Sequence, residues 1–383
     1  MSTHTAAAAA TIPPGDAVPA PAGAGPQLDR LRRLAGEHGV GTLVLREPAT
    51  LSWLTGARWN IQQSLHASCF DVVLTGLDTD DVSARVVTNA IEAPRLRDVE
   101  LAHFLDGDLE FDAVAWDEDR SSRLPGGPSV GGDVTGAGRV DLARTLAAER
   151  LVLTTEQSEL LAHVAADTTR VTGEVARGVR PGQREREIAG RLCAALLDAG
   201  LEPIVYFVGS DDRLVTHKHP LATGRSVERV VMLAVCARRH GLVASVTRIV
   251  ALRPLPEADM RRYRALLDVE AAFLDATRAG AALDDVFATG AGAYAKAGFS
   301  PDQWRTHHQG GLSGFAPREV LATSRATVRL APGMVLGWNP SAEGWKVEDT
   351  TLLTESGPQP LDVDPTWPHL TVAGRRRPGV LEL

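Results

Sequence analysis

The sequence predicts an α+β protein of two domains. At 383 residues the chain is long enough for two ordinary domains. In its first part short strands alternate with helices, whereas in its second part long helices precede a series of antiparallel-type strands. The character of the sequence changes at residues 148–155, which we take as the domain boundary. We therefore expect four parts, namely a tail at 1–26, a domain at 27–150, a domain at 151–372 and a C-terminal tail at 373–383.

The composition is that of a globular protein without nucleic-acid or membrane partners. Hydrophobic residues make up 44% of the chain and charged residues 23%. A net charge of -8 argues against nucleic-acid binding, and no apolar run approaches the ~20 residues that a membrane helix needs. Residues 1–26 are mostly Ala, Pro and Gly, and they lack the basic and apolar regions of a signal peptide, so a disordered tail is predicted. The 3 cysteines form no CxxC pair, which is typical of reduced thiols and predicts a cytoplasmic protein.

The first domain is predicted to begin with a helix and to continue with short strands. Leucines at helical spacing predict a helix over 28–37. Glu47–Pro48 predicts a turn, and the charged, Gly- and Pro-rich stretch 117–133 predicts a loop. Apolar runs of strand length predict strands at 42–45, 70–75 and 85–89.

The second domain is predicted to begin with two helices. Thr154 and Gln157 have the spacing of a capping box, in which side chains satisfy the free N–H groups at a helix start, so a helix is expected over 156–177. A second helix is expected over 185–199 and ends at Gly200. Three strands, two helices and three further strands are expected to follow, in that order, at 204–208, 230–237, 242–250, 259–279, 283–298, 335–338, 346–354 and 371–372.

Histidines, glycines and acids gather in three segments of the second domain. The first segment, HKHPLAT at 217–223, leads into an apolar strand. The second is HHQGGL at 307–312, and the third, at 332–350, contains WNP and VED around Asn339 and Glu348. Because imidazole serves as acid and base near neutral pH, these segments are the best candidates for an active site.

These segments resemble the active-site segments of the creatinase/aminopeptidase family. The resemblance covers about residues 27–361 and implies a pita-bread second domain preceded by a smaller creatinase-type α/β domain. Most members of that family hold two metal ions with two Asp, one His and two Glu. Thr247-Arg248 and Gly241 align this chain with the pattern, and His308 and Glu348 then stand at two ligand positions. The three other ligand positions fall on Ala234, Ser245 and Asn339.

This set of residues predicts that the chain has no metal cofactor. Two divalent cations need several carboxylates to offset their charge and to bridge them. Ala234 offers no ligand atom, while Ser245 and Asn339 are neutral and poor ligands. Asp349 is close in sequence, but the alternation of side chains along a strand points it away from the face of Glu348. A single weakly bound ion stays open.

The same family includes a metal-free enzyme, creatinase, which hydrolyses a C–N bond, and the resemblance implies comparable chemistry here. The proton-transferring histidine of creatinase lies in a His-Pro turn, which matches His219. His308 and Glu348 are then expected to orient and polarise the substrate. Creatinase has a Glu that grips the guanidinium group at the position of Thr247, which argues against creatine as the substrate. The reaction expected is hydrolysis or elimination at a C–N bond of a small polar molecule.

Six further side chains are predicted to bind the substrate. Arg248 and Arg318 can pair with a carboxylate, although Arg248 can equally pair with an acid of the protein. Asn339 can both donate and accept hydrogen bonds, and Trp338 either lines the pocket or fills the core. Ser245 and His307 complete the set.

The first domain also fits the resemblance, which implies a homodimer. The stretch EPATLSWLTG at 47–56 is similar to the N-domain signature of the family, in which this domain completes the pocket of the partner subunit. Trp59, Asn60 and His66 follow the signature and are expected to cross the interface.

Two other functions stay open beside the metal-free enzyme. The loss of three ligands is also what relaxed selection produces, so the chain can be a non-catalytic module that binds a small molecule or a peptide. An Xaa-Pro-type metallopeptidase is the third possibility, and it requires tight metal binding despite the replaced ligands.

Overall fold

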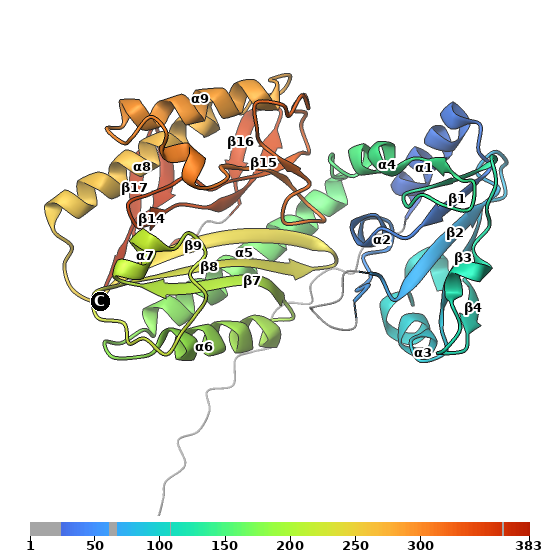
Figure 1. Ribbon diagram of the computed structural model, residues 1–383, viewed down its shortest axis with the longest axis horizontal. Helices are drawn as coiled ribbons and strands as arrows, with labels where there is room; N and C mark the ends of the chain where they lie inside the picture. The colour runs from blue at the N-terminus through green and yellow to red at the C-terminus, as the bar shows by residue number, and fades with distance from the viewer. Residues whose placement is uncertain (1–23, 61–66, 108, 362–363) are drawn as a thin grey trace, which may run out of the picture.

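The structure confirms the α+β class. It is a computed structural model that describes residues 24–60, 67–107, 109–361 and 364–383. Figure 1 shows a smaller body, coloured blue to green, beside a larger body that holds the rest of the chain. Apart from residues 24–26, the tail predicted at 1–26 lies outside the described residues, and so does His66.

The smaller body is built on one six-stranded sheet of strand order β4-β3-β2-β1-β5-β6. The first strand pairs antiparallel with β2 and parallel with β5. The strands are β1 (Thr42–Leu45), β2 (Phe70–Thr75), β3 (Ser83–Asn89), β4 (Glu110–Val114), β5 (Val130–Gly132) and β6 (Val140–Asp141). The helices are α1 (Gly25–His38), α2 (Pro48–Thr55), α3 (Ala93–Arg95) and α4 (Ala143–Glu149), with short π or 3-10 turns at Leu96–Glu100, Phe104–Gly107 and Arg120–Arg123.

Two expectations for this body were wrong. Glu47–Pro48 does not turn the chain but begins α2, because proline fits the first turn of a helix, where no N–H partner is needed. The stretch 117–133 is not all loop, since its end is the inner strand β5. Gly131 looked like a loop residue, but a Cβ there would lie 2.4 Å from Cδ1 of Leu142, so tight packing inside the sheet requires glycine.

The larger body has two main sheets with long helices on their outer faces (Figure 1), and two smaller sheets, β13-β14 and β17-β18. One sheet has the order β19-β9-β8-β7 and packs against α5 and α6, and the other has the order β11-β10-β12-β15-β16 and packs near α8 and α9. The helices are α5 (Thr155–Arg177), α6 (Glu185–Asp198), α7 (Asp212–Thr216), α8 (Glu257–Ala276) and α9 (Leu283–Lys296), with a 3-10 turn at Gln303–Thr306. The strands are β7 (Glu202–Ser210), β8 (Val230–Arg239), β9 (Leu242–Ala251), β10 (Gly310–Ser313), β11 (Val320–Leu321), β12 (Val335–Trp338), β13 (Ser341–Ala342), β14 (Trp345–Lys346), β15 (Asp349–Thr354), β16 (Gly357–Pro360), β17 (His369–Val372), β18 (Arg375–Pro378) and β19 (Leu381–Glu382).

The start of α5 confirms the capping box. The Thr154 hydroxyl accepts a hydrogen bond from the backbone N–H of Gln157 at 3.2 Å, and the Gln157 side chain accepts one from the backbone N–H of Thr154 at 3.1 Å. Gly200, which follows α6, has a φ of 71°, so the left-handed turn expected at the end of this helix is present.

The C-terminal tail expected at 373–383 is wrong, because this segment is part of the fold. Strand β18 pairs with β17, and β19 joins the first sheet of the larger body parallel to β9. Arg377 of β18 is buried and forms ion pairs with Glu270 and Asp349. A run of three arginines is typical of an exposed tail, and only the buried acids explain why one of them lies inside. The strand expected over 346–354 is also interrupted, because Val347 and Glu348 separate β14 from β15.

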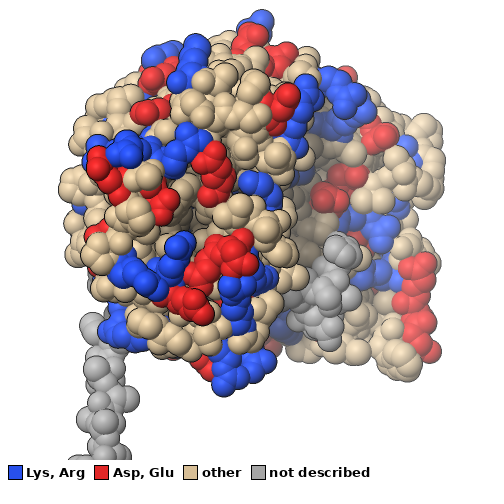
Figure 2. All heavy atoms as spheres, turned by 60° about the vertical axis from the view of Figure 1, so that its left-hand side comes forward, with Lys and Arg blue, Asp and Glu red and all other residues tan. Residues whose placement is uncertain are grey.

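The surface carries mixed charge. On the face drawn in Figure 2, basic and acidic side chains alternate over the larger body rather than separating into patches of one sign. Among the described helices, none has the length and apolar character that crossing a membrane requires.

Candidate active site

A cavity of about 200 Å³ brings together most of the side chains expected at the active site. It lies in the larger body, and its lining is half apolar, with β7 and β8 supplying much of the apolar wall. Its lining residues are Val205, Phe207, His219, Ala234, Val235, Cys236, His308, Pro317, Arg318, Asn339, Lys346 and Glu348. A larger cavity of about 590 Å³ lies between the two bodies, but it contains none of these chemically active groups, so the smaller cavity is the better candidate.

Glu348 is a buried carboxylate held between two cations. Lys346 Nζ lies 2.8 Å from its Oε2, and Arg318 Nη2 lies 2.5 Å from its Oε1. Burial by itself raises the pKa of Glu348, but the positive charges of Lys346 and Arg318 outweigh this effect and lower the pKa to about 2. Glu348 is therefore ionised near neutral pH, where it holds the two cations in place and does not serve as a proton donor.

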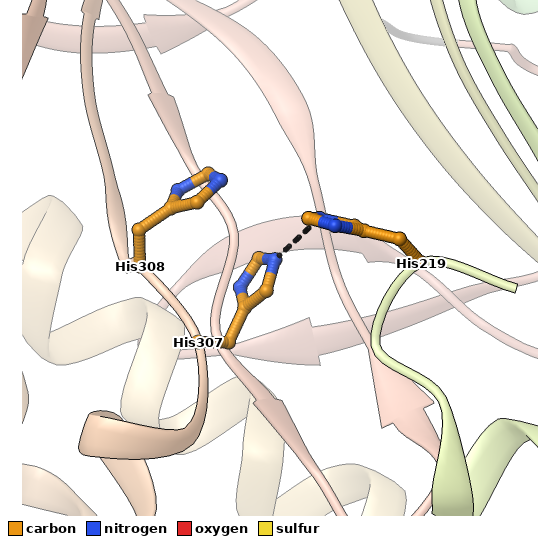
Figure 3. Close-up of side chains that lie close together, drawn as sticks. All are labelled: His219, His307 and His308. Atoms are coloured by element: carbon orange, nitrogen blue, oxygen red, sulfur yellow. Dashed lines mark hydrogen bonds between the residues drawn. The ribbon is translucent and has the colours of Figure 1, made fainter.

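Three histidines gather at the cavity beside this ion pair (Figure 3). The Nε2 atoms of His219 and His307 are 3.1 Å apart, and the rings of His307 and His308 stack with centroids 4.3 Å apart. Partial removal from water lowers the pKa of all three, to about 3 for His307 and about 4 for His308, with Lys346 or Arg318 adding to the effect. His308 is exposed, so its hydration is reduced by the cavity around it and not by complete burial. All three imidazoles are neutral at pH 7.

A buried carboxylate anchors the loop that carries His219. Glu185, at the start of α6, accepts hydrogen bonds from Ser210 at 2.9 Å and from the backbone N–H of Thr223 at 3.0 Å. It also pairs with Arg213 in α7. Because these partners flank His219 on both sides, Glu185 holds the ends of the loop while His219 stacks on Phe207 with ring centroids 4.8 Å apart.

Glycines fix the segment that carries His307 and His308. A Cβ at Gly310 would lie 1.8 Å from the backbone oxygen of Gly337, and one at Gly311 would lie 2.1 Å from that of Val320. Both glycines have positive φ values, of 98° and 145°. The pair lets β10 fit between β11 and β12, which places both histidines just ahead of the sheet.

The structure brings five of the nine predicted site residues to the cavity wall, and a sixth stands directly behind it. His219, His308, Glu348, Asn339 and Arg318 line the cavity, and His307 contacts His219. Two buried polar atoms at this wall, Arg318 Nε and Asn339 Oδ1, have no hydrogen-bond partner among the described residues. A polar ligand is the natural partner for such groups.

Three predicted substrate-binding residues lie elsewhere. Arg248 is 2% exposed and pairs with Asp349 at 2.7 Å, so it serves a buried ion network instead. Trp338 packs in the core, where its Nε1 donates to the Thr277 hydroxyl at 3.0 Å. Ser245 is buried beneath Cys236, to whose sulfur its hydroxyl donates at 3.2 Å. The contacts of Asp349 confirm that it faces away from Glu348, as strand alternation predicts.

Lys346 is the site residue that sequence reasoning missed. A signal for it existed, because the chain has lysine only at positions 218, 296 and 346, and the last of these lies two residues before Glu348. Side chains two positions apart on extended backbone share a face, so the pair could have been predicted.

Residues near the expected dimer interface make contacts within the chain. Arg238, at the end of β8, donates to the Asn60 side chain at 3.0 Å and lies over the ring of Trp59. Trp59 and Asn60 thus connect the smaller body to Arg238 of the larger one. Any role of these two residues at a dimer interface would be additional to this contact.

The chain belongs to metallopeptidase family M24. The model of that family matches residues 159–355, just over half of the chain. Similar solved structures include the prolidase from Pyrococcus horikoshii OT3, with 15% identity, a TM-score of 0.73, and coverage of 88% of this chain and 98% of that one. The dipeptidase PepE from Mycobacterium ulcerans is 19% identical with a TM-score of 0.72, covering 94% and 98%. The X-Pro aminopeptidase from Thermotoga maritima MSB8 is 15% identical with a TM-score of 0.70, covering 93% and 99%.

These comparisons confirm the resemblance and the pita-bread fold expected from the sequence. They place the chain among peptidase-like hydrolases by family. A search of curated proteins gave no significant match.

The residues present do not fit the pair of metal ions that the family implies. Ala234 lines the cavity without a donor atom, and the Ser245 hydroxyl faces Cys236 rather than the cavity. Both oxygens of Glu348 are occupied by cationic side chains. Because Asn339 is neutral, no free carboxylate is left among the five ligand positions. Two divalent cations would therefore lie beside the positive charges of Lys346 and Arg318 without enough negative charge to offset them.

Proposed function

We propose that this chain is a hydrolase that cleaves a C–N bond of a small polar molecule without the paired metal ions of its family. The observation that carries the proposal is the ion pair of Glu348 with Lys346 and Arg318, which stands beside neutral histidines where the family places metal ligands. Fixed cations at such a position can stabilise the negative charge that develops when water attacks a carbonyl or amidine carbon.

The roles of the side chains follow from their states of protonation. Neutral His219 accepts a proton from the attacking water, and it returns that proton to the nitrogen as the C–N bond breaks. In an elimination, the same imidazole would take the proton from the carbon beside the C–N bond. Glu348 keeps Lys346 and Arg318 charged and in position, while Asn339 binds a polar group of the substrate.

The cavity limits the size of the substrate. Its volume of about 200 Å³ falls below the ~300–1,000 Å³ of typical ligand pockets, which favours a small molecule over a peptide. Val205, Phe207 and Pro317 give it an apolar side, so the substrate is expected to combine a polar reacting end with a small apolar part.

The proposal is tested by screening small amides, ureas and amidines for release of ammonia or amine, with chelator-treated protein. We expect turnover in the presence of chelator, and a loss of roughly 100-fold or more in His219→Ala and His308→Ala. His217→Ala is the matched control, because His217 is exposed and its ring forms a hydrogen bond with the neighbouring Thr216, outside the cavity. Full activity of both His219→Ala and His308→Ala on the true substrate contradicts the proposal.

The two alternative functions predict different outcomes in the same experiment. Binding of a compound without turnover favours a non-catalytic module, for which the replacement of three ligand positions is the supporting observation. Stoichiometric, tightly bound metal together with cleavage of Xaa-Pro dipeptides favours a metallopeptidase, as the names of the similar structures suggest. We further propose that the protein acts in the cytoplasm, in keeping with its free cysteines.

A further inference from the structure

The three histidines form a cluster whose geometry resembles a set of metal ligands. One ring nitrogen of each of His219, His307 and His308 can be chosen so that all lie within 4.8 Å of one another. The cluster joins two segments far apart in the sequence, the loop between α7 and β8 and the segment between the 3-10 turn at Gln303–Thr306 and β10 (Figure 3). We call these three residues the trihistidine site.

The contact between His219 and His307 has the spacing of two ligands on one ion. Their Nε2 atoms are 3.1 Å apart, and two imidazoles on a tetrahedral Zn²⁺, each at ~2.0–2.1 Å from the ion, have nitrogens about 3.4 Å apart. Without an ion, the N–H of one ring must donate a hydrogen bond to the nitrogen of the other. His307 Nδ1 is buried and has no hydrogen-bond partner among the described residues, so no contact of this atom within that part of the chain fixes the tautomer of His307.

The surroundings select the kind of ion. The three donors are imidazole nitrogens, and the carboxylate of Glu348 is held by Lys346 and Arg318. Ions that bind through oxygen, such as Mg²⁺, Ca²⁺ and Mn²⁺, therefore find no free carboxylate ligand at this site. Zn²⁺, Ni²⁺ and Cu²⁺ bind neutral imidazole strongly, and three histidines with one open position are a known arrangement for zinc.

We propose that the trihistidine site binds one Zn²⁺-type ion and that this ion inhibits the enzyme. The site differs from the carboxylate-rich, two-ion centre of the family in its donors and in the number of ions. Inhibition follows because a bound ion occupies the lone pair of His219, which the proposed reaction needs to accept a proton. This second half rests on the proposed function, whereas the binding itself does not.

Binding is tested on the full-length, tag-free protein by calorimetric titration with ZnCl₂, and by the visible spectrum of added Co²⁺. We expect one Zn²⁺ per chain and no measurable binding of Mg²⁺. Each of His219→Ala, His307→Ala and His308→Ala should weaken Zn²⁺ binding by roughly 100-fold, the upper end of what removing even an orienting partner costs. His217→Ala, which alters the same loop outside the cluster, should bind like the wild type. Circular dichroism of each variant shows that loss of binding is not loss of folding.

The outcomes separate the two proposals. Absence of Zn²⁺ binding, or binding that survives all three alanine variants, overturns the trihistidine site. Binding of two ions that is lost in Glu348→Gln but retained in His307→Ala also overturns it, because the ions would then use the family ligands. If Zn²⁺ binds as expected but raises turnover, the inhibitory role and the metal-free reaction both fail while the site stands. If no substrate is found, the ZnCl₂ titration still tests whether the trihistidine site binds an ion.

Discussion

Lys346 and Glu348 show how single residues set the chemistry of the cavity. The two lie two positions apart in the sequence and pair at 2.8 Å, and Arg318 holds the second oxygen of Glu348. This arrangement keeps the carboxylate ionised, and together with reduced hydration it keeps the histidines neutral. The candidate site thus has permanent charges on one side and neutral proton acceptors on the other.

We expect replacement of Lys346 by Met to raise the pKa of His219. The pKa of this histidine lies below its ordinary value, first because of reduced hydration and then because of the charge of Lys346, while Glu348 acts in the opposite direction. Removing the ammonium group of Lys346 leaves the negative charge of Glu348 less neutralised. This charge then favours the protonated form of the His219 imidazole. NMR titration of the histidine ring protons measures the shift without a substrate, and the acid limb of kcat/KM should move to higher pH with it. Lys296→Met is the control, and an unchanged His219 titration in Lys346→Met would refute the assignment.

At the scale of elements, local sequence signals predicted helices well where their ends carry specific chemistry. The capping box at Thr154 identified the start of α5 to within one residue. The expected strand at 371–372 lies in β17, whereas β18 and β19 were missed, because β18 is short and rich in arginine and β19 is a two-residue strand that pairs with β9, far away in the sequence.

Thr154→Ala tests the contribution of the cap. The substitution removes the acceptor for the N–H of Gln157, which should lower the free energy of unfolding by about 1 kcal/mol. Urea denaturation followed by circular dichroism provides the measurement. Thr155→Ala, in the exposed first position of the same helix, should be nearly neutral, and equal losses in both variants would argue against a capping role.

Arg377→Met tests whether β18 is part of the fold. Arg377 is 4% exposed and neutralises Glu270 and Asp349, so its loss leaves buried charge without a partner. We expect a loss of ~3–5 kcal/mol in the free energy of unfolding. Arg376→Met alters the exposed neighbour on the same strand and should change stability by less than ~0.5 kcal/mol. A neutral effect of Arg377→Met would mean that the segment behaves as the tail expected from its sequence.

At the scale of the whole molecule, stability is expected to depend on the neutral histidines. His307 titrates near its ordinary value of about 6.5 when the chain is unfolded, but at about 3 in the folded protein. The unfolded chain therefore binds more protons between these two values, and stability is lost as the pH falls from 6.5 toward 3.

Replacing His307 by Gln should reduce this acid sensitivity. Between pH 7 and pH 5 we expect the wild type to lose about 1–2 kcal/mol more of its free energy of unfolding than His307→Gln does. Urea denaturation at the two pH values measures the difference, and His217→Gln serves as the control. Parallel curves for the wild type and His307→Gln would show that His307 is not held in its neutral form.

The oligomeric state is a second property of the whole molecule. The resemblance of the first domain implies a homodimer, so light scattering after size-exclusion chromatography should give twice the 40.7 kDa of one chain. A monomer at all concentrations tested would show that Trp59 and Asn60 serve only the contact with Arg238 inside the chain.

The sequence by itself determined the fold family and the long helices, and it predicted that His219, His308 and Glu348 belong to one site, because periodicity, caps and motif spacing are local and can be recognised without knowledge of the tertiary contacts. It also predicted that Ala234, Ser245 and Asn339 stand where the family has carboxylate ligands. Only the tertiary structure decided which polar residues share the cavity. Lys346 lines the cavity beside Glu348, whereas Arg248 pairs with Asp349 away from it, because the burial of a charge depends on which opposite charge packs against it. The place of β18 in the fold was decided in the same way, since Arg377 is stable inside the protein only where Glu270 and Asp349 pair with it.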